Sequence, residues 1–112
     1  MTPHRSLLFA PANRPDIHYK ALASGADIVC LDLEDAVPPA DKASARSTAT
    51  SFLTDASGPH RVVRINGLRS ADGLRDIIAL LDGNPTGGTV FLPKVATADE
   101  VRITDELITE AT

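Results

Sequence analysis

The sequence has 112 residues, of which 43% are hydrophobic and 23% charged, and its net charge at pH 7 is −4. These values predict a single globular domain over residues 1–112, and the scattered basic residues and few aromatics argue against a nucleic-acid partner. No apolar run approaches the ~18 residues of a membrane span, and a lone cysteine, Cys30, fits the reducing cytoplasm.

The first half of the sequence alternates two β-rich runs with two helical patterns. Residues 6–10 (SLLFA) predict the first strand, and residues 28–33 (IVCLDL) predict the second. A helix over 15–24 is expected between them, because proline is favoured in the first turn of a helix and the glycine that follows residue 24 ends it. Two prolines open a second, alanine-rich helix over 38–53.

The second half of the sequence repeats this alternation. Residues 61–65 (RVVRI) and 89–92 (TVFL) predict the third and fourth strands. A serine cap begins a helix over 70–83, and the capping box TADE begins another helix at residue 97. The apolar stripes expected to face the core are Leu74, Ile77, Ile78 and Leu81 in the third helix, and Val101, Thr104, Leu107 and Ile108 in the fourth.

Four β–α units in succession predict an α/β fold with a parallel sheet. Two architectures fit the pattern: the first four units of a (β/α)8 TIM-type barrel, or a small open parallel α/β sheet. A complete barrel typically needs ~250 residues, so the barrel interpretation predicts a truncated, partial domain. Such a domain has two open strand edges, and we expect self-association or a missing C-terminal half to cover them.

Side-chain alternation along the predicted strands favours the barrel. In each of the last three strands one face is apolar throughout, whereas the other starts apolar and becomes polar at its carboxyl end. The three expected polar faces comprise residues 30, 32 and 34, residues 62, 64 and 66, and residues 90, 92 and 94. The polar side chains expected at the common carboxyl edge are Asp32, Glu34, Arg64, Asn66 and Lys94. Ligands bind at this edge in parallel α/β folds.

Two interpretations of these charges are open. They could serve only to satisfy one another, since buried charges need partners. Their repetition on three consecutive strands favours a ligand site instead. Arg64 can grip a carboxylate through two parallel hydrogen bonds, and Lys94 adds a point charge. Asp32, Glu34 and Asp35 could orient these cations or hold the waters of a bound Mg²⁺.

Asn13 is a further candidate, because it stands just before Arg14 and Pro15 at the start of the first predicted helix. The segment could cap that helix, or its backbone N–H groups could receive an anion at the helix N-terminus. The sequence leaves both alternatives open. The candidate substrate-binding residues are therefore Arg64, Lys94, Asn13 and Asn66.

Four segments together resemble the citrate lyase β-subunit family, which belongs to the larger HpcH/HpaI aldolase group. They are residues 5–15 (RSLLFAPANRP), 21–37 (ALASGADIVCLDLEDAV), 61–68 (RVVRINGL) and 92–95 (LPKV). The resemblance implies a (β/α)8 barrel, often trimeric or hexameric. It also implies Mg²⁺-dependent cleavage or condensation of a C–C bond in 3-hydroxyacyl thioesters of CoA or an acyl carrier protein, with citryl, malyl and citramalyl groups as usual substrates.

The resemblance also implies roles for individual residues. Arg64 matches the family arginine that holds the substrate carboxylate or oxo-acid, and Lys94 matches the lysine of the PKV strand. Glu34 and Asp35 match the acidic pair near the metal and its waters, with Asp32 in the same charge network. The family's two direct Mg²⁺ carboxylates lie on later strands, so neither a direct metal ligand nor a firm catalytic residue is expected in this chain.

Two positions depart from the family pattern: Ala12 stands where a glycine is expected, and Ala96 stands where a glutamate is expected. Together with the absent metal ligands, these departures predict that the isolated chain is inactive as a lyase. Two alternatives stay open beside that of an enzyme segment. One is a non-catalytic remnant or binding module that keeps an anion site for a carboxylate or acyl-CoA. The other is a complete four-stranded domain of unrelated function.

Overall fold

The computed structural model describes residues 3–85 and 87–111, and it contains every predicted strand and helix. The strands are β1 (Leu7–Pro11), β2 (Ile28–Asp32), β3 (His60–Arg64) and β4 (Thr89–Phe91). The helices are α1 (Pro15–Leu22), α2 (Lys42–Leu53), α3 (Ala71–Asp82) and α4 (Ala98–Ala111). None of the helices in the described ranges is long and apolar enough to cross a membrane.

The predicted helix over 38–53 differs from the observed structure at its start. A short 3₁₀ helix, η1 (Pro39–Asp41), precedes α2. Pro38 is extended, with φ −64° and ψ 153°, because the ring of Pro39 disfavours the helical conformation in the residue before it. Two successive prolines therefore delay the α-helix to Lys42.

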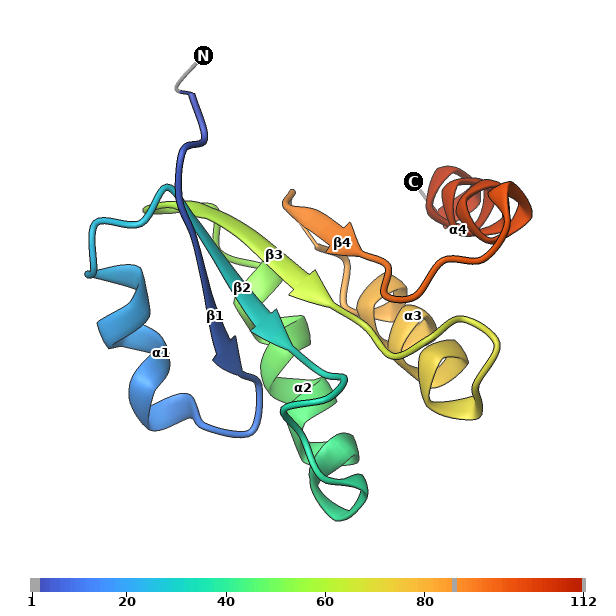
Figure 1. The fold of residues 1–112 in the computed structure, drawn as a ribbon, viewed down its shortest axis with the longest axis horizontal. Coiled ribbons are helices and arrows are strands. Elements are labelled where there is room, and N and C mark those ends of the chain that lie inside the picture. The colour runs from blue at the N-terminus through green and yellow to red at the C-terminus, as the bar shows by residue number, and fades with distance from the viewer. Residues whose placement is uncertain (1–2, 86, 112) are drawn as a thin grey trace.

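The four strands are parallel and lie in the order β1-β2-β3-β4, so each strand pairs with its predecessor in the chain (Figure 1). A doubly wound open sheet instead reverses its strand order at a switch point. A strictly sequential parallel order is the arrangement of a (β/α) barrel. The fold is therefore that of four β–α units of a TIM-type barrel, as the side-chain alternation predicts.

The hydrophobic core lies between one face of the sheet and the helices that follow one another around it (Figure 1). Within β2 and β3 and directly after them, the residues fully buried in this core are Val29, Leu31, Leu33, Val63 and Ile65. The helices contribute Ala45, Ala49, Phe52, Leu53 and Leu80. Ala45 and Ala49 are small, so the backbone of α2 can approach the sheet closely.

The opposite face of the sheet is concave and only partly covered. Phe9 of edge strand β1 and Phe91 of edge strand β4 stack with their ring centroids 6.4 Å apart, above the two central strands. The guanidinium of Arg64 lies 5.0 Å from the centre of the Phe9 ring. Phe9 and Phe91 remain 45% and 44% exposed. This face therefore has the layered apolar side chains of a barrel interior without the full cover that a closed barrel provides.

The predicted apolar stripe of the third helix is wrong in two positions. Leu74 and Ile78 are exposed, whereas Ile77 is buried as expected and Leu80 is buried in addition. The helix turns Asp76 inward, where its carboxylate accepts hydrogen bonds from Asn66, and this rotation carries Leu74 and Ile78 outward. The buried hydrogen bonds of Asp76 therefore determine which side of the helix faces inward, and apolar periodicity alone does not predict it.

The start of the last helix agrees with the capping-box prediction in part. The carboxylate of Glu100 accepts hydrogen bonds from the backbone N–H groups of Ala96 and Thr97, both at 2.9 Å. The predicted stripe is right at Thr104, which is buried, and wrong at Val101, which is exposed.

Candidate functional site

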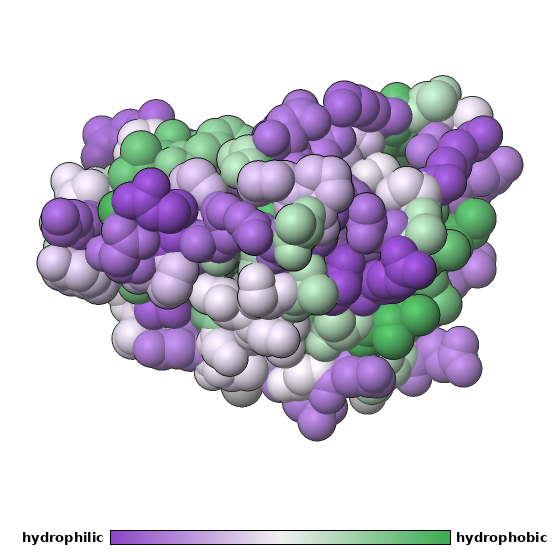
Figure 2. All heavy atoms as spheres, turned by 90° about the horizontal axis from the view of Figure 1, so that it is seen from below, coloured by the Kyte–Doolittle hydropathy of each residue, from purple (hydrophilic) through white to green (hydrophobic). Residues whose placement is uncertain are grey.

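Charged side chains gather where the strands end, as predicted. The lower side of Figure 1 is the side at which the strand arrows end, and the view from that side shows hydrophilic groups in purple across the surface with hydrophobic groups in green beside them (Figure 2). We call the charged group at the ends of β2, β3 and β4 the carboxyl-edge cluster. Its members are Asp32, Glu34, Asp35, Arg64 and Lys94.

Asp32 and Arg64 form the centre of the carboxyl-edge cluster. Nε and Nη2 of Arg64 donate to the two carboxylate oxygens of Asp32, each at 2.8 Å. The carboxylate also accepts hydrogen bonds from the backbone N–H groups of Glu34 (3.0 Å) and Ala36 (3.1 Å). Asp32 is only 2% exposed. Burial alone would raise the pKa of Asp32, but the hydrogen bonds from Arg64 and the backbone outweigh it and lower the pKa.

One edge of the Arg64 guanidinium is paired with Asp32, and the other has no partner in the described part of the chain. The edge formed by Nε and Nη2 is occupied by Asp32, so the predicted carboxylate grip is not available there. Nη1 has no hydrogen-bond partner within the described part of the chain, and the edge formed by Nη1 and Nη2 can still meet a carboxylate through two hydrogen bonds. The hydrogen bonds with Asp32 raise the pKa of Arg64 further, so the cation is permanent.

Lys94 joins the cluster from the segment after β4. Its Nζ lies 3.1 Å from Oε2 of Glu34 and 3.5 Å from Oδ1 of Asp35. Oε1 of Glu34 lies 3.8 Å from Nε of Arg64, so Glu34 links the two cations. The hydrogen bond to Glu34 and the charge of Asp35 raise the pKa of Lys94. The side chain is 71% exposed and can therefore reorient toward a ligand.

The predicted faces of the fourth strand are wrong. Phe91 pairs with Arg64 in the sheet register and lies on the concave face, whereas Val90 and Leu92 pack against the helix-side core. Lys94 nevertheless reaches the cluster, because the strand ends at Phe91 and Lys94 adopts a left-handed conformation with φ 49°. Strand alternation does not continue through that turn.

Asn66 does not join Arg64, so the predicted common placement of these two residues is wrong. The Nδ2 group of Asn66 donates to Oδ2 of Asp76 (2.7 Å) and to the backbone oxygen of Leu33 (3.0 Å), and its Oδ1 accepts from Lys42 (2.7 Å). The reason is that β3 ends at Arg64, so the alternation of faces stops before residue 66. Asn66 therefore belongs to a buried polar network between β2, α2 and α3.

This buried network contains three residues that the sequence analysis missed: Lys42, Arg46 and Asp76. Asp76 is fully buried and accepts hydrogen bonds from Nε of Arg46 (2.8 Å) and from the backbone N–H of Asn66 (2.8 Å). One signal in the sequence is Asp76 itself, an acidic residue directly before Ile77 on the inward side of an amphipathic helix. Its partners lie 10 and 30 positions away in sequence, so no local pattern identifies them.

Asn13 lies at the carboxyl edge but does not cap the first helix. The N-cap residue of α1 is Arg14, and no side-chain hydrogen bond caps the helix. Nδ2 of Asn13 instead donates to Asp41 at 3.0 Å. Its Oδ1 is buried and has no partner within the described residues. The neighbouring Ala12 donates its N–H to the backbone oxygen of Asp32 (2.9 Å), which places this loop beside the cluster.

The carboxylates of the cluster do not form a set of direct Mg²⁺ ligands. Both oxygens of Asp32 already accept hydrogen bonds from Arg64, and Glu34 and Asp35 face Lys94. Within residues 3–85 and 87–111, no group of three or more His, Cys, Asp or Glu side chains is arranged to hold a metal ion. These carboxylates are therefore part of the charge network with Arg64 and Lys94.

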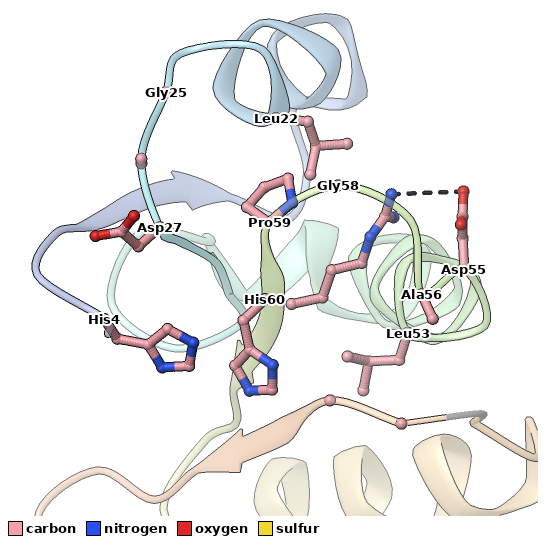
Figure 3. A pocket seen from close by; sticks show the side chains of 14 residues that line it. His4, Leu22, Gly25, Asp27, Leu53, Asp55, Ala56, Gly58, Pro59 and His60 are labelled. Atoms are coloured by element: carbon pink, nitrogen blue, oxygen red, sulfur yellow. Dashed lines mark ion pairs between the residues drawn. The ribbon is translucent and has the colours of Figure 1, made fainter. Parts of the chain in front are cut away.

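A separate hollow lies at the amino ends of the strands (Figure 3). This cavity of about 500 Å³ is lined in part by His4, Asp27 and His60. The rings of His4 and His60 stack at 5.2 Å, and an ion pair of 3.4 Å joins Arg61 to Asp55 (Figure 3). Because parallel α/β barrels place their ligands at the carboxyl ends of the strands, we take the cluster and not this hollow as the candidate site.

Comparison with known proteins gives a consistent family. Residues 5–112 match the sequence model of the HpcH/HpaI aldolase/citrate lyase family. The chain is 39% identical over 110 residues to an L-malyl-CoA/beta-methylmalyl-CoA lyase of Cereibacter sphaeroides, a match that covers 96% of this chain and 35% of that protein. It is 46% identical over 95 residues to a citrate lyase subunit beta-like protein of Mycobacterium tuberculosis, covering 84% of this chain and 33% of that protein.

Solved structures show the same similarity. RipC from Yersinia pestis superposes with a TM-score of 0.75 at 38% identity, over 96% of this chain and 42% of RipC. CitE from Mycobacterium tuberculosis, in complex with magnesium, acetoacetate and coenzyme A, superposes with a TM-score of 0.70 at 41% identity, over 88% of this chain and 35% of CitE. The chain thus spans about a third of the length of the curated relatives it matches.

Proposed function

Because this chain belongs to the HpcH/HpaI aldolase/citrate lyase family, we propose that its carboxyl-edge cluster binds the carboxylate of a small oxo-acid or acyl thioester. The observation that carries the proposal is the geometry of Arg64. Asp32 fixes one edge of the guanidinium, so the other edge is oriented before a ligand arrives. Lys94 supplies a second, mobile positive charge beside it.

The chemistry of the relatives supports this ligand class. One solved structure of a Mycobacterium tuberculosis citrate lyase beta subunit contains oxaloacetate and magnesium, and another contains acetoacetate and coenzyme A. Cleavage of a C–C bond beside a carbonyl leaves an enolate, which positive charge stabilises. We propose that the reaction of the whole protein is Mg²⁺-dependent cleavage or formation of a C–C bond in a 3-hydroxyacyl thioester, and that Arg64 orients the substrate carboxylate.

A second candidate function is binding without cleavage. It rests on the unpaired edge of the Arg64 guanidinium, which can hold a carboxylate whether or not a bond is then cleaved. Such a site can hold an anion without stabilising an enolate. Release of acetyl-CoA from malyl-CoA or citramalyl-CoA, measured with millimolar Mg²⁺, separates the two functions. Saturable binding of oxaloacetate with no such release would support the binding module.

The exchange of Arg64 for Lys is the direct test of the proposed site. We expect Arg64→Lys to weaken oxaloacetate binding by about 2 kcal/mol, because lysine lacks the planar fork that can offer one pair of parallel hydrogen bonds to Asp32 and a second pair to the ligand. This loss corresponds to ~30-fold in Kd and is measured by titration calorimetry.

Arg75→Lys is the matched control, since Arg75 is 64% exposed on α3 and pairs only at 3.6 Å with Asp72. This control should bind oxaloacetate as the wild type does. If the wild type and Arg64→Lys bind oxaloacetate with equal affinity, Arg64 does not contact the ligand.

We further propose that the 112-residue chain self-associates through its concave face and open edges. Leu7 on edge strand β1 is 41% exposed, beside Phe9 and Phe91 on the same face. Exposed apolar side chains next to an unpaired strand edge favour association. Light scattering coupled to size exclusion should therefore give a mass above the 11.8 kDa of one chain.

The control for self-association compares two surface substitutions. Leu7→Lys places a charge on the β1 edge and should shift the population toward a single chain. Tyr19→Lys changes an exposed residue of α1 and should leave the mass unchanged. A wild-type chain that stays at 11.8 kDa at all concentrations, without binding a dye for apolar surfaces, would contradict the proposal.

We also propose a cytoplasmic location. The chain has a single cysteine, Cys30, which is fully buried on β2. Burial raises the pKa of this thiol to about 12, so Cys30 stays protonated and unreactive. A chain that relies on no disulfide of its own fits a reducing compartment.

A further inference from the structure

Lys42 is the first residue of α2, and its ammonium group has a complete set of acceptors. Nζ donates to the backbone oxygens of Leu33 (3.0 Å) and Glu34 (3.1 Å) and to Oδ1 of Asn66 (2.7 Å). An ammonium has three donors, so none remains for a ligand. Lys42 therefore holds the chain itself and does not bind an anion.

The two carbonyls that Lys42 holds lie just beyond the end of β2. The strand ends at Asp32, and the last sheet-like hydrogen bond joins the N–H of Leu33 to the backbone oxygen of Arg64 (2.9 Å). From Glu34 onward the sheet no longer fixes the backbone. The N–H of Glu34 donates to the Asp32 side chain, and the carbonyl of Glu34 accepts from Lys42. Side chains thus replace the sheet in this segment.

The third partner of Lys42 is itself fixed. Nδ2 of Asn66 donates to Asp76 and to the backbone oxygen of Leu33, which turns its Oδ1 toward Lys42. Asp76 is fully buried and is also held by Arg46. The chain of contacts from α3 through Asn66 to Lys42 is continuous, it is buried at Asp76 and Asn66 and partly buried at Lys42, and it ends on the backbone of Glu34.

We propose that Lys42 is a positioning residue for the carboxyl-edge cluster: it fixes the backbone from which the carboxylate of Glu34 reaches Lys94 and Arg64. Glu34 is 8% exposed and lies 3.1 Å from Nζ of Lys94 and 3.8 Å from Nε of Arg64. The importance of Lys42 for ligand binding rests on the proposed function. The positioning itself does not, because the contact between Glu34 and Lys94 exists without a ligand.

The experiment uses the pKa of Lys94 as its readout, measured by NMR titration of the lysine side chains without ligand. The chain has only three lysines, Lys20, Lys42 and Lys94, so their signals are separable. Removing the charge of Lys42 by itself would raise the pKa of Lys94, because a like charge is lost. Loss of the contact between Lys94 and Glu34 would lower the pKa of Lys94. The two effects have opposite signs.

We expect Lys42→Met to lower the pKa of Lys94 and to weaken oxaloacetate binding by about tenfold, as removal of outer partners of a site does. Lys20→Met, on the exposed side of α1, should change neither quantity. If Lys42→Met fails to fold, Lys42→Arg replaces it; Lys42→Arg keeps the charge in a wider, planar group and should still lower the pKa of Lys94.

An unchanged or raised pKa of Lys94 in the folded variant would overturn the positioning role. A lowered pKa in a chain whose wild type binds no oxaloacetate would support the positioning role and contradict the proposed function instead. The experiment can therefore contradict the positioning role of Lys42 without contradicting the proposed function, and the reverse.

Discussion

Asp76→Ala is expected to destabilise the fold by about 3–5 kcal/mol, the cost of removing one partner from a buried ion pair. The carboxylate of Asp76 is fully buried and accepts three hydrogen bonds, one from Arg46 and two from Asn66. Alanine would leave the guanidinium of Arg46, which is 13% exposed, without its main partner. This loss approaches the whole stability of a small domain, and urea unfolding followed by circular dichroism measures it.

Asp72→Ala is the matched control for that prediction. Asp72 lies one turn earlier on α3, is 40% exposed, and pairs with the same Arg46 at 3.4 Å. Because a half-exposed pair contributes little, this variant should lose less than about 1 kcal/mol. If Asp76→Ala does not fold, Asp76→Asn keeps the shape and loses the charge, and it should show an intermediate loss. Equal stability of the Asp72 and Asp76 variants would show that the buried network is not an anchor.

Arg64→Met should cost about 3 kcal/mol at pH 7. The substitution removes the bidentate partner of Asp32, which is 2% exposed, and leaves that carboxylate only its two backbone donors. Methionine keeps an apolar stem beneath Phe9, so the loss reports mainly on charge and hydrogen bonding. Chemical unfolding at pH 7 gives the value, with Arg75→Met as the exposed control.

The same pair has a pH dependence of defined sign. The pKa of Asp32 in the fold lies below its ordinary value of 3.8, so its contribution is complete above that value and is lost as the pH falls through the folded pKa. Arg64→Met removes the main cationic partner, and Asp32 then protonates at higher pH. The stability difference between wild type and variant should therefore be largest near neutral pH and shrink below pH ~4. A difference that grows in acid would contradict the assignment.

The part of the site that lies on the strands could be predicted from the sequence. Alternation places Asp32 and Arg64 on the same face of adjacent strands, and the register of the sheet then sets them side by side. Both are the last residues of their strands. Beyond those ends the same rule failed, because Asn66 turns toward the helices and Lys94 arrives through a left-handed turn.

The parts that could not be predicted depend on contacts between distant segments. Lys42 contacts Asn66 from 24 positions away, and Arg46 contacts Asp76 from 30 positions away. In the sequence, Lys42 and Arg46 resemble ordinary charges at the start of a helix. The exposed positions of Leu74 and Ile78 have the same origin, since the buried carboxylate of Asp76 and not apolar periodicity sets the rotation of α3.

The proposed carboxylate site has a location that one measurement can test. Titration of the ¹⁵N-labelled chain with oxaloacetate, followed by amide chemical shifts, reports where the ligand binds. We predict saturable shifts in the segments that form the carboxyl-edge cluster, residues 32–36, 64–66 and 93–95. Shifts confined to the hollow at the amino ends, around His4, Asp27 and His60, or no saturable shift at all, would contradict the account.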